Sequence, residues 1–193
     1  MSYPLRLAVP ADQSALEALI ERSARALSAG DYSTAQIDGA LRGSFGVDSQ
    51  LVRDGTYFVV ASAGGIVACG GWSRRHTLFG GDAHADRSAA FLDPTRESAR
   101  IRAFFVAPEH ARRGLGTLLL RHCEAAARAE GFKSLALVAT LPGTRLYARH
   151  GFLPTGTIEH RLENGLTITF VPMRKALGEV DPAGGGNGDG CRA

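Results

Sequence analysis

The chain has 193 residues, of which 45% are hydrophobic and 21% are charged. This composition is typical of a folded globular protein and excludes a disordered chain, and the length suits one domain better than two. The formal net charge is +3, and residues 1–177 alone carry +5. That excess favours an anionic small ligand and is too small to indicate binding to nucleic acid.

The first fifty residues predict one strand and two helices. Residues 5–9 alternate between apolar and polar side chains, as a short strand does, and residues 11–27 place their apolar side chains at helical spacing. A second helix is expected to start at Ser33, because Ser33 and Gln36 have the spacing of a capping box.

Residues 55–73 contain no charged side chain over nineteen positions, which is the length of a membrane-spanning helix. Five glycines and the break at Ala63-Gly64-Gly65 favour a hairpin instead, with strands at residues 57–61 and 66–72. The N-terminus has no basic start followed by an apolar core, so it does not resemble a signal peptide. We therefore expect a cytoplasmic protein without membrane contacts.

Residues 74–98 contain no periodic segment, and this stretch is long for a connection inside a compact domain. Two interpretations are open, a loop that faces the substrate and a floppy insertion.

The second half of the chain gives clearer signals. We expect strands at residues 99–106 and 134–139, a helix from Gly114 to about Glu130 that Gly131 ends, one or two helical turns at 144–149, and a final hairpin of residues 152–162 and 166–174 around Asn164-Gly165. The resulting order, β-α-α-β-β-β-α-β-α-β-β, predicts an α/β fold with a mixed sheet flanked by helices. Residues 1–177 form the single domain, and the glycine-rich residues 178–193 are expected to be disordered.

The three cysteines do not indicate a disulfide framework. Cys69 and Cys123 lie in apolar stretches and are expected to be small core residues, and Cys191 lies in the glycine-rich tail. No CxxC motif or His/Cys cluster is present in the sequence, so we expect no metal site.

The segment between the strand at 101–106 and the following helix carries the strongest chemical signal. Gly114 and Gly116 open the helix, where backbone N–H groups have no partner inside the helix and the helix dipole is positive. Such a turn can bind a diphosphate, and Arg112 and Arg113 add positive charge. A dinucleotide fingerprint would need glycine in place of Leu119, and no Gly-Lys-Ser/Thr follows, so both common alternatives fail.

Val106, followed eight positions later by Gly114 and then by Leu115-Gly116, resembles the acetyl-CoA signature of the GNAT N-acetyltransferase superfamily. The sequence Leu-Tyr-Ala-Arg-His-Gly-Phe at residues 146–152 resembles the Tyr-x-x-x-Gly-Phe segment of that family, and residues 171–175 resemble its last strand. The resemblance covers roughly residues 4–176. It implies the GNAT fold, in which a mostly antiparallel sheet contains a splayed parallel pair.

The resemblance also implies an acetyl-CoA-dependent N-acetyltransferase that acts on a primary amine of a small molecule. Backbone groups of Phe104 and Val106 would pair with the pantetheine arm, and Tyr147 would donate a proton to the departing CoA thiolate. The cofactor-binding residues that it implies are Phe104, Phe105, Val106, Arg112, Arg113, Gly114, Leu115, Gly116, Thr117 and Thr140.

Three positions depart from the family pattern. Arg100 occupies the place of a glutamate that serves many members as the base, Ala111 replaces the leading Arg or Gln, and Thr140 replaces a common Asn. His76, Glu97 and His160 are candidate bases, and the sequence does not choose among them.

The acceptor is not identified by the sequence. Phe45 and Trp72 are candidates for lining an acceptor pocket, although core packing explains each equally well, and the variable segments are residues 30–32, 44–48 and the loop after Trp72. Transfer of another acyl group, transfer to a protein N-terminus or lysine, and a non-catalytic CoA-binding regulatory module stay open as alternatives. The protein is expected to be a monomer or a homodimer.

Overall fold

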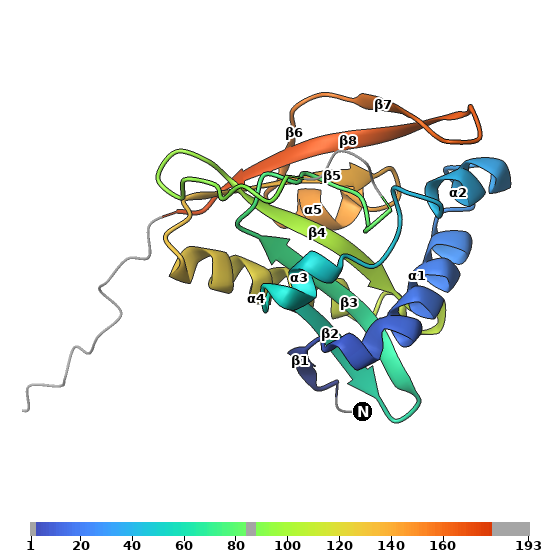
Figure 1. Cartoon of the computed structure of the whole chain (residues 1–193), viewed down its shortest axis with the longest axis horizontal. Coiled ribbons are helices and arrows are strands. Elements are labelled where there is room, and N and C mark those ends of the chain that lie inside the picture. Colours follow the sequence, from blue (N-terminus) through green and yellow to red (C-terminus); the bar gives the residue numbers. More distant parts are fainter. Residues whose placement is uncertain (1–2, 84–87, 179–193) are drawn as a thin grey trace, which may run out of the picture.

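The computed structural model describes residues 3–83 and 88–178. Figure 1 shows one sheet with helices on both faces. The strands are β1 (Leu5–Leu7), β2 (Tyr57–Ser62), β3 (Gly65–Ser73), β4 (Ala99–Val106), β5 (Ser134–Thr140), β6 (Leu153–Pro154), β7 (Ile158–Arg161) and β8 (Thr167–Ala176). The helices are α1 (Gln13–Leu27), α2 (Thr34–Ala40), α3 (Ser49–Arg53), α4 (Leu115–Ala129) and α5 (Thr144–Arg149), with 3-10 turns η1 (Pro10–Asp12) and η2 (Pro108–His110).

The sheet is mixed and mostly antiparallel, as predicted. Its strand order is β1-β2-β3-β4-β5-β8-β6, and β7 also pairs with β8. The parallel pair β4–β5 is joined only at Ala99↔Leu135 and Arg100↔Ala136, whereas β5 and β8 pair along the whole of β5. The second half of β4 therefore separates from β5 and opens the sheet at its centre.

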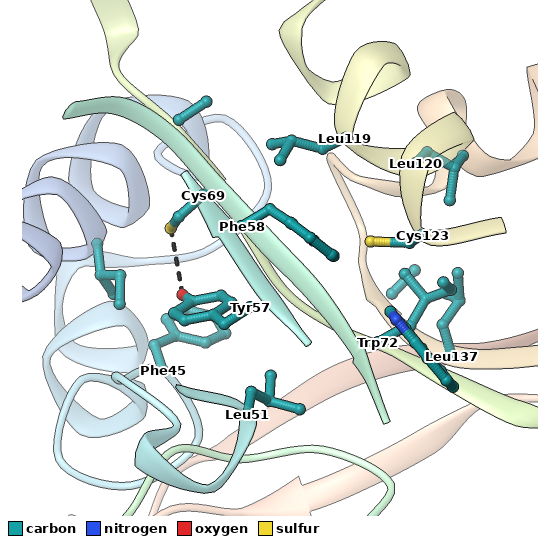
Figure 2. Close-up of a cluster of buried hydrophobic side chains, with 14 of the residues drawn as sticks. Phe45, Leu51, Tyr57, Phe58, Cys69, Trp72, Leu119, Leu120, Cys123 and Leu137 are labelled. Atoms are coloured by element: carbon teal, nitrogen blue, oxygen red, sulfur yellow. Dashed lines mark hydrogen bonds between the residues drawn. The ribbon is translucent and has the colours of Figure 1, made fainter. Parts of the chain in front are cut away.

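Neighbouring side chains of β2 point to opposite faces of the sheet and pack against different helices. Tyr57 lies with Phe45 and Leu51, and its neighbour Phe58 faces the helix α4 (Figure 2). The side chains that α4 contributes to this second face include Leu119, Leu120 and Cys123, all fully buried. Cys69 and Cys123 are buried and free, which confirms them as core residues.

Most element boundaries agree with the prediction, and the capping box is confirmed because the Gln36 N–H donates to Ser33 Oγ. The helix α3 was not predicted. It is only five residues long, and it starts where the Asp48 carboxylate accepts a hydrogen bond from the Gln50 N–H at 3.1 Å. The strand expected at 152–162 is divided into β6 and β7, which are separated by residues 155–157.

Two sequence predictions fall partly outside the described residues. Apart from Gly178, the tail predicted at 178–193 lies beyond them, as do residues 84–87 of the long loop. Among the residues that the structure does describe, no helix is long and apolar enough to cross a membrane, and no group of His, Cys, Asp and Glu side chains is arranged to hold a metal ion. The cytoplasmic location stays a prediction.

Candidate active site

A cavity of about 920 Å³ lies where β4 separates from β5. Its lining comes from the end of α1, the segment 44–46, the loop at 78–80, the strand β4, the turn before α4, and the end of β5 with α5. Most of the residues singled out in the sequence meet here: Phe45, Phe104, Phe105, Val106, Arg112, Gly114, Leu115, Gly116, Thr117, Thr140 and Tyr147.

A β-bulge in β4 gives the cavity its shape. Cys69 pairs with Phe105 and Gly71 pairs with Arg102, so two residues of β4 stand opposite the single residue Gly70. Ala103, in the bulge, has φ of +55°, a left-handed conformation that is uncommon for a residue with a side chain. A Cβ atom at Gly70 would lie 2.6 Å from the Phe104 ring, so glycine is required opposite the bulge.

The bulge is supported from inside the core by two polar side chains. The Tyr57 hydroxyl lies 3.3 Å from the Ala103 carbonyl oxygen and 3.2 Å from Cys69 Sγ, and the Cys69 thiol donates toward the same carbonyl oxygen at 3.8 Å. Figure 2 shows the Tyr57–Cys69 contact. Burial raises the pKa of the Tyr57 phenol well above its usual value and that of the Cys69 thiol to about 12, so both groups stay protonated and can donate.

The turn that precedes α4 leaves several backbone N–H groups without a backbone partner inside the described chain. Arg112 and Gly114 both have positive φ values, +63° and +81°. Ala111 N–H donates to the Pro108 carbonyl and Leu118 N–H to the Gly114 carbonyl, whereas within the described chain the N–H groups of residues 112–117 have no backbone acceptor. Successive N–H groups in such a conformation form a concave anion site, and this geometry fits a diphosphate.

Basic side chains surround that turn. Those that line the cavity at this end are His110, Arg112, Arg145, Arg149 and His150. The ring of His150 is fixed at 3.1 Å from Thr117 Oγ1 through Nε2. Arg113 does not line the cavity, because its guanidinium donates to the Tyr3 hydroxyl at 3.2 Å, so only its backbone belongs to the turn.

Tyr147 lies on α5, lines the cavity and is 8% exposed. Its ring packs edge-on against Phe104, with 6.2 Å between centroids, and against Phe152 at 5.7 Å. Burial raises the pKa of the Tyr147 phenol above its ordinary value, so the phenol keeps its proton at neutral pH.

The last two cofactor candidates already have partners inside the protein. The Val106 N–H, at the end of β4, donates to Ser23 Oγ of α1 at 3.2 Å. Thr140 ends β5, and its Oγ1 accepts a hydrogen bond from the Gly143 N–H at 3.3 Å, which stabilises the turn into α5.

Residues 18–152 match the sequence profile of the acetyltransferase (GNAT) family. The chain belongs to this family. The recognition made from the sequence motifs is thereby confirmed, and the chain is an acyltransferase. A comparison with curated proteins finds no match.

Solved structures of this family share the fold at low identity. A GCN5-related N-acetyltransferase from Rhodopseudomonas palustris is 20% identical, with a TM-score of 0.68 over 92% of this chain and 97% of the other. The PaiA N-acetyltransferase from Thermoplasma acidophilum, in complex with coenzyme A, is 14% identical, with a TM-score of 0.61 over 91% and 99%. YncA from Salmonella typhimurium, solved with its cofactor acetyl-CoA, is 18% identical, with a TM-score of 0.60 over 99% and 100%.

This GNAT chain does not place the candidate bases in the cavity lining. Arg100 is half-buried beside Glu97 and Arg174, and burial lowers the pKa of its guanidinium. His76 Nδ1 lies 3.6 Å from Glu97 Oε1, away from the lining residues. His160 packs against Phe79, which does line the cavity, at 5.3 Å between ring centroids.

The two acceptor-pocket candidates separate in the structure. Phe45 lines the cavity, whereas Trp72 is 2% exposed and packs against Phe132 in the core next to α4. Trp72 points to the other face of the sheet because it shares the side-chain direction of Phe58, not that of Tyr57.

Sequence reasoning missed several residues that line the cavity, namely Arg145, Arg149, His150 and Phe170. Asp31 and Phe79 also line it, and both lie in segments expected to face the acceptor, although neither was singled out as a residue. Arg149 and His150 lie inside the recognised Tyr-x-x-x-Gly-Phe segment, so that motif contained a signal for them. Phe170 carries no such signal, because only the pairing of β8 with β5 brings it to the cavity.

Proposed function

We propose that this acyltransferase transfers the acetyl group of acetyl-CoA to a primary amine of a small molecule. The observation that carries the proposal is that residues 112 and 114–117, whose N–H groups have no backbone acceptor within the described chain, line the same cavity as Tyr147. A diphosphate bound at one end and a proton donor at the other are what a CoA thioester requires.

The chain offers a binding surface for each part of acetyl-CoA. The N–H groups of residues 112–117, with Arg112 and His150 beside them, would hold the diphosphate. The exposed edge of β4 after the bulge would pair with the pantetheine arm, and Val106 N–H would exchange Ser23 Oγ for an acceptor on that arm. Acetyl-CoA supplies an activated acyl group as a thioester.

Tyr147 is the proposed proton donor. In the transfer, the amine nitrogen forms a bond to the acyl carbon and the carbon–sulfur bond breaks. The sulfur leaves as a thiolate with a conjugate-acid pKa of about 8.5, and it takes the phenolic proton of Tyr147. The amine gives its proton to water, and the phenol is restored from solvent.

The test is the substitution Tyr147→Phe, which removes the hydroxyl and keeps the ring that packs on Phe104 and Phe152. We expect kcat, measured by thiol release, to fall by about a hundredfold or more. Calorimetry should show acetyl-CoA affinity nearly unchanged and in the micromolar range. Tyr3→Phe is the comparison variant: its hydroxyl contacts Arg113 and His110 beside the turn, so it tests acetyl-CoA affinity, whereas kcat at saturating acetyl-CoA should stay unchanged.

A non-catalytic CoA-binding module would bind acetyl-CoA and release no thiol with any amine. Unchanged turnover in Tyr147→Phe would remove Tyr147 as the proton donor and leave acetyl transfer intact.

A further inference from the structure

One end of the cavity is lined by phenylalanine rings from four separate segments. They are Phe45 before α3, Phe79 in the long loop, Phe105 after the bulge of β4, and Phe170 in β8. The ring centroid of Phe45 lies 6.1 Å from that of Phe105 and 6.2 Å from that of Phe170. The ring centroids of Phe79 and Phe170 are 5.7 Å apart. Phe45 and Phe170 are buried, whereas Phe79 and Phe105 remain partly exposed.

The same end of the cavity has little negative charge to offer. Of the cavity-lining residues in the described parts of the chain, Asp31 is the one carboxylate, and it is exposed at the end of α1. The nearby carboxylate of Asp48 is fully buried and lies 2.9 Å from the Arg102 guanidinium, so its charge is already balanced. A polyamine needs several carboxylates to replace the water around its ammonium groups, and this wall does not supply them.

The aromatic wall is held in place before any ligand arrives. Arg102 donates to the carbonyl groups of Thr77 and Gly80, on either side of Leu78 and Phe79. The loop is further held by Gly81 N–H on the Gly43 carbonyl at 3.2 Å, by Asp82 N–H on the Val47 carbonyl at 2.9 Å, and by Ser49 N–H on the Asp82 carboxylate at 3.0 Å.

The loop and the segment 43–49 also approach each other closely. A Cβ atom at Gly81 would lie 2.8 Å from the Gly46 Cα. The part of the loop that carries Phe79 therefore favours the substrate-facing interpretation over the floppy one. A wall that is already ordered costs little conformational entropy when a ligand packs on it.

We propose that the acceptor is a monoamine whose amino group is carried on an aromatic or similarly bulky apolar body, and that this body packs against Phe79 and Phe105. The proposal rests on acetyl transfer as the function of this cavity. It names the class of acceptor by the surface that would recognise it: four aromatic rings, one exposed carboxylate and a preformed wall.

An apolar acceptor site also bears on how the amine loses its proton. Burial among phenylalanine rings disfavours an ammonium ion relative to a neutral amine and so lowers the pKa of the bound amine. The four candidate or expected base positions, Arg100, His76, Glu97 and His160, are not among the lining residues. Desolvation by the aromatic wall would supply the neutral nucleophile in their place.

The test compares three amines with purified full-length protein and acetyl-CoA: 2-phenylethylamine, ethanolamine and spermidine. We expect kcat/KM for 2-phenylethylamine to exceed that of the other two by about tenfold or more, because a buried aromatic ring contributes at least that factor. Phe79→Ala should raise the KM for 2-phenylethylamine about tenfold and leave the KM for acetyl-CoA unchanged.

Phe91→Ala is the matched control, since Phe91 lies in the same loop, is 62% exposed and stacks on Arg75 at 4.3 Å instead of lining the cavity. Phe79→Leu keeps apolar volume and should lose less than Phe79→Ala. Unfolding temperatures of all three variants show whether the loop remains folded, and calorimetric binding of 2-phenylethylamine to the protein saturated with CoA reports on the wall without turnover.

The outcomes test the aromatic acceptor separately from acetyl transfer itself. A preference for spermidine or ethanolamine, or equal effects of Phe79→Ala and Phe91→Ala, overturns the aromatic acceptor and leaves acetyl transfer standing. Absence of thiol release with every amine, or no binding of acetyl-CoA, overturns acetyl transfer itself and the acceptor proposal with it.

Discussion

The two ends of the cavity are made in different ways. At the end formed by residues 110–117, backbone N–H groups are exposed, two residues hold left-handed conformations, and cationic side chains gather. At the end formed by Phe45, Phe79 and Phe105, hydrogen-bonding groups such as those of Arg102 are consumed inside the protein and the surface left for a ligand is apolar. The first end is therefore suited to binding a charged ligand. The second end is suited to selecting an acceptor by its shape.

The largest effect is expected where the apolar end depends on a buried charge pair. The side chains of Arg102 and Asp48 are 3% and 0% exposed, and Arg102→Met leaves the Asp48 carboxylate buried without its partner. We expect a loss of about 3–5 kcal/mol in the free energy of unfolding, measured by denaturant titration.

Two further variants sharpen this result. The double variant Arg102→Met with Asp48→Asn should recover part of the loss, because no unpaired charge remains. Arg25→Met removes a guanidinium paired at the exposed surface with Asp38 at 2.6 Å, and should change stability far less than Arg102→Met. Equal losses of unfolding free energy for Arg102→Met and Arg25→Met would show that the buried pair contributes no more to stability than an exposed one.

The charged end is expected to lose acetyl-CoA affinity when the backbone conformation of its turn is changed. Gly114 has φ of +81°, which a β-branched residue adopts only with strain, so Gly114→Val should deform the turn and lower acetyl-CoA affinity by about a hundredfold or more. Isothermal calorimetry measures this. Gly64→Val is the control, because Gly64 does not have a positive φ and has open space where a Cβ would be placed. Tight binding by Gly114→Val would remove the turn as the diphosphate site.

The same contrast explains what the sequence could predict. The turn at 112–117 and Tyr147 each lie within a short continuous segment. A local motif was therefore enough to single out both, and both line the cavity. The aromatic end is assembled from residues 45, 79, 105 and 170, whose proximity depends on the strand order and on the bulge at Ala103. No pattern within any one of these segments shows that they meet.

Trp72 is a candidate that the sequence could not place on one face of the sheet. Its size made it a candidate for the acceptor pocket, and the segment around it alternates too little to fix which face of the sheet it occupies. The register Phe58↔Gly70 decides the question by placing Trp72 in the core with Phe132. The short helix α3 was missed for a related reason, because five residues give too few turns for a periodic signal.

A smaller effect is expected at the boundary between the two ends, where the bulge turns Phe104 toward Tyr147 and Phe105 toward Phe45. Tyr57→Phe removes the hydroxyl that lies 3.3 Å from the Ala103 carbonyl oxygen, and should cost about 1–2 kcal/mol of unfolding free energy. Because the bulge positions both ends, kcat should fall more than the affinity for acetyl-CoA. A change in stability with unchanged kcat would confine Tyr57 to a structural role.

The smallest effect concerns pH: kcat is expected to stay constant over a range of pH. The measurement tests whether burial keeps the proposed acid, Tyr147, protonated. The Tyr147 pKa is raised by burial above the usual phenol value of about 10. An acid must hold its proton to act, so ionisation of Tyr147 should not reduce kcat until the pH passes above 10. We expect kcat, measured at saturating substrates, to show no fall between pH 7 and about 9.5. A fall centred below pH 9 that is absent in Tyr147→Phe would mean that the phenol ionises early, and that the cavity around α5 admits more water than the packing of Phe104 and Phe152 allows.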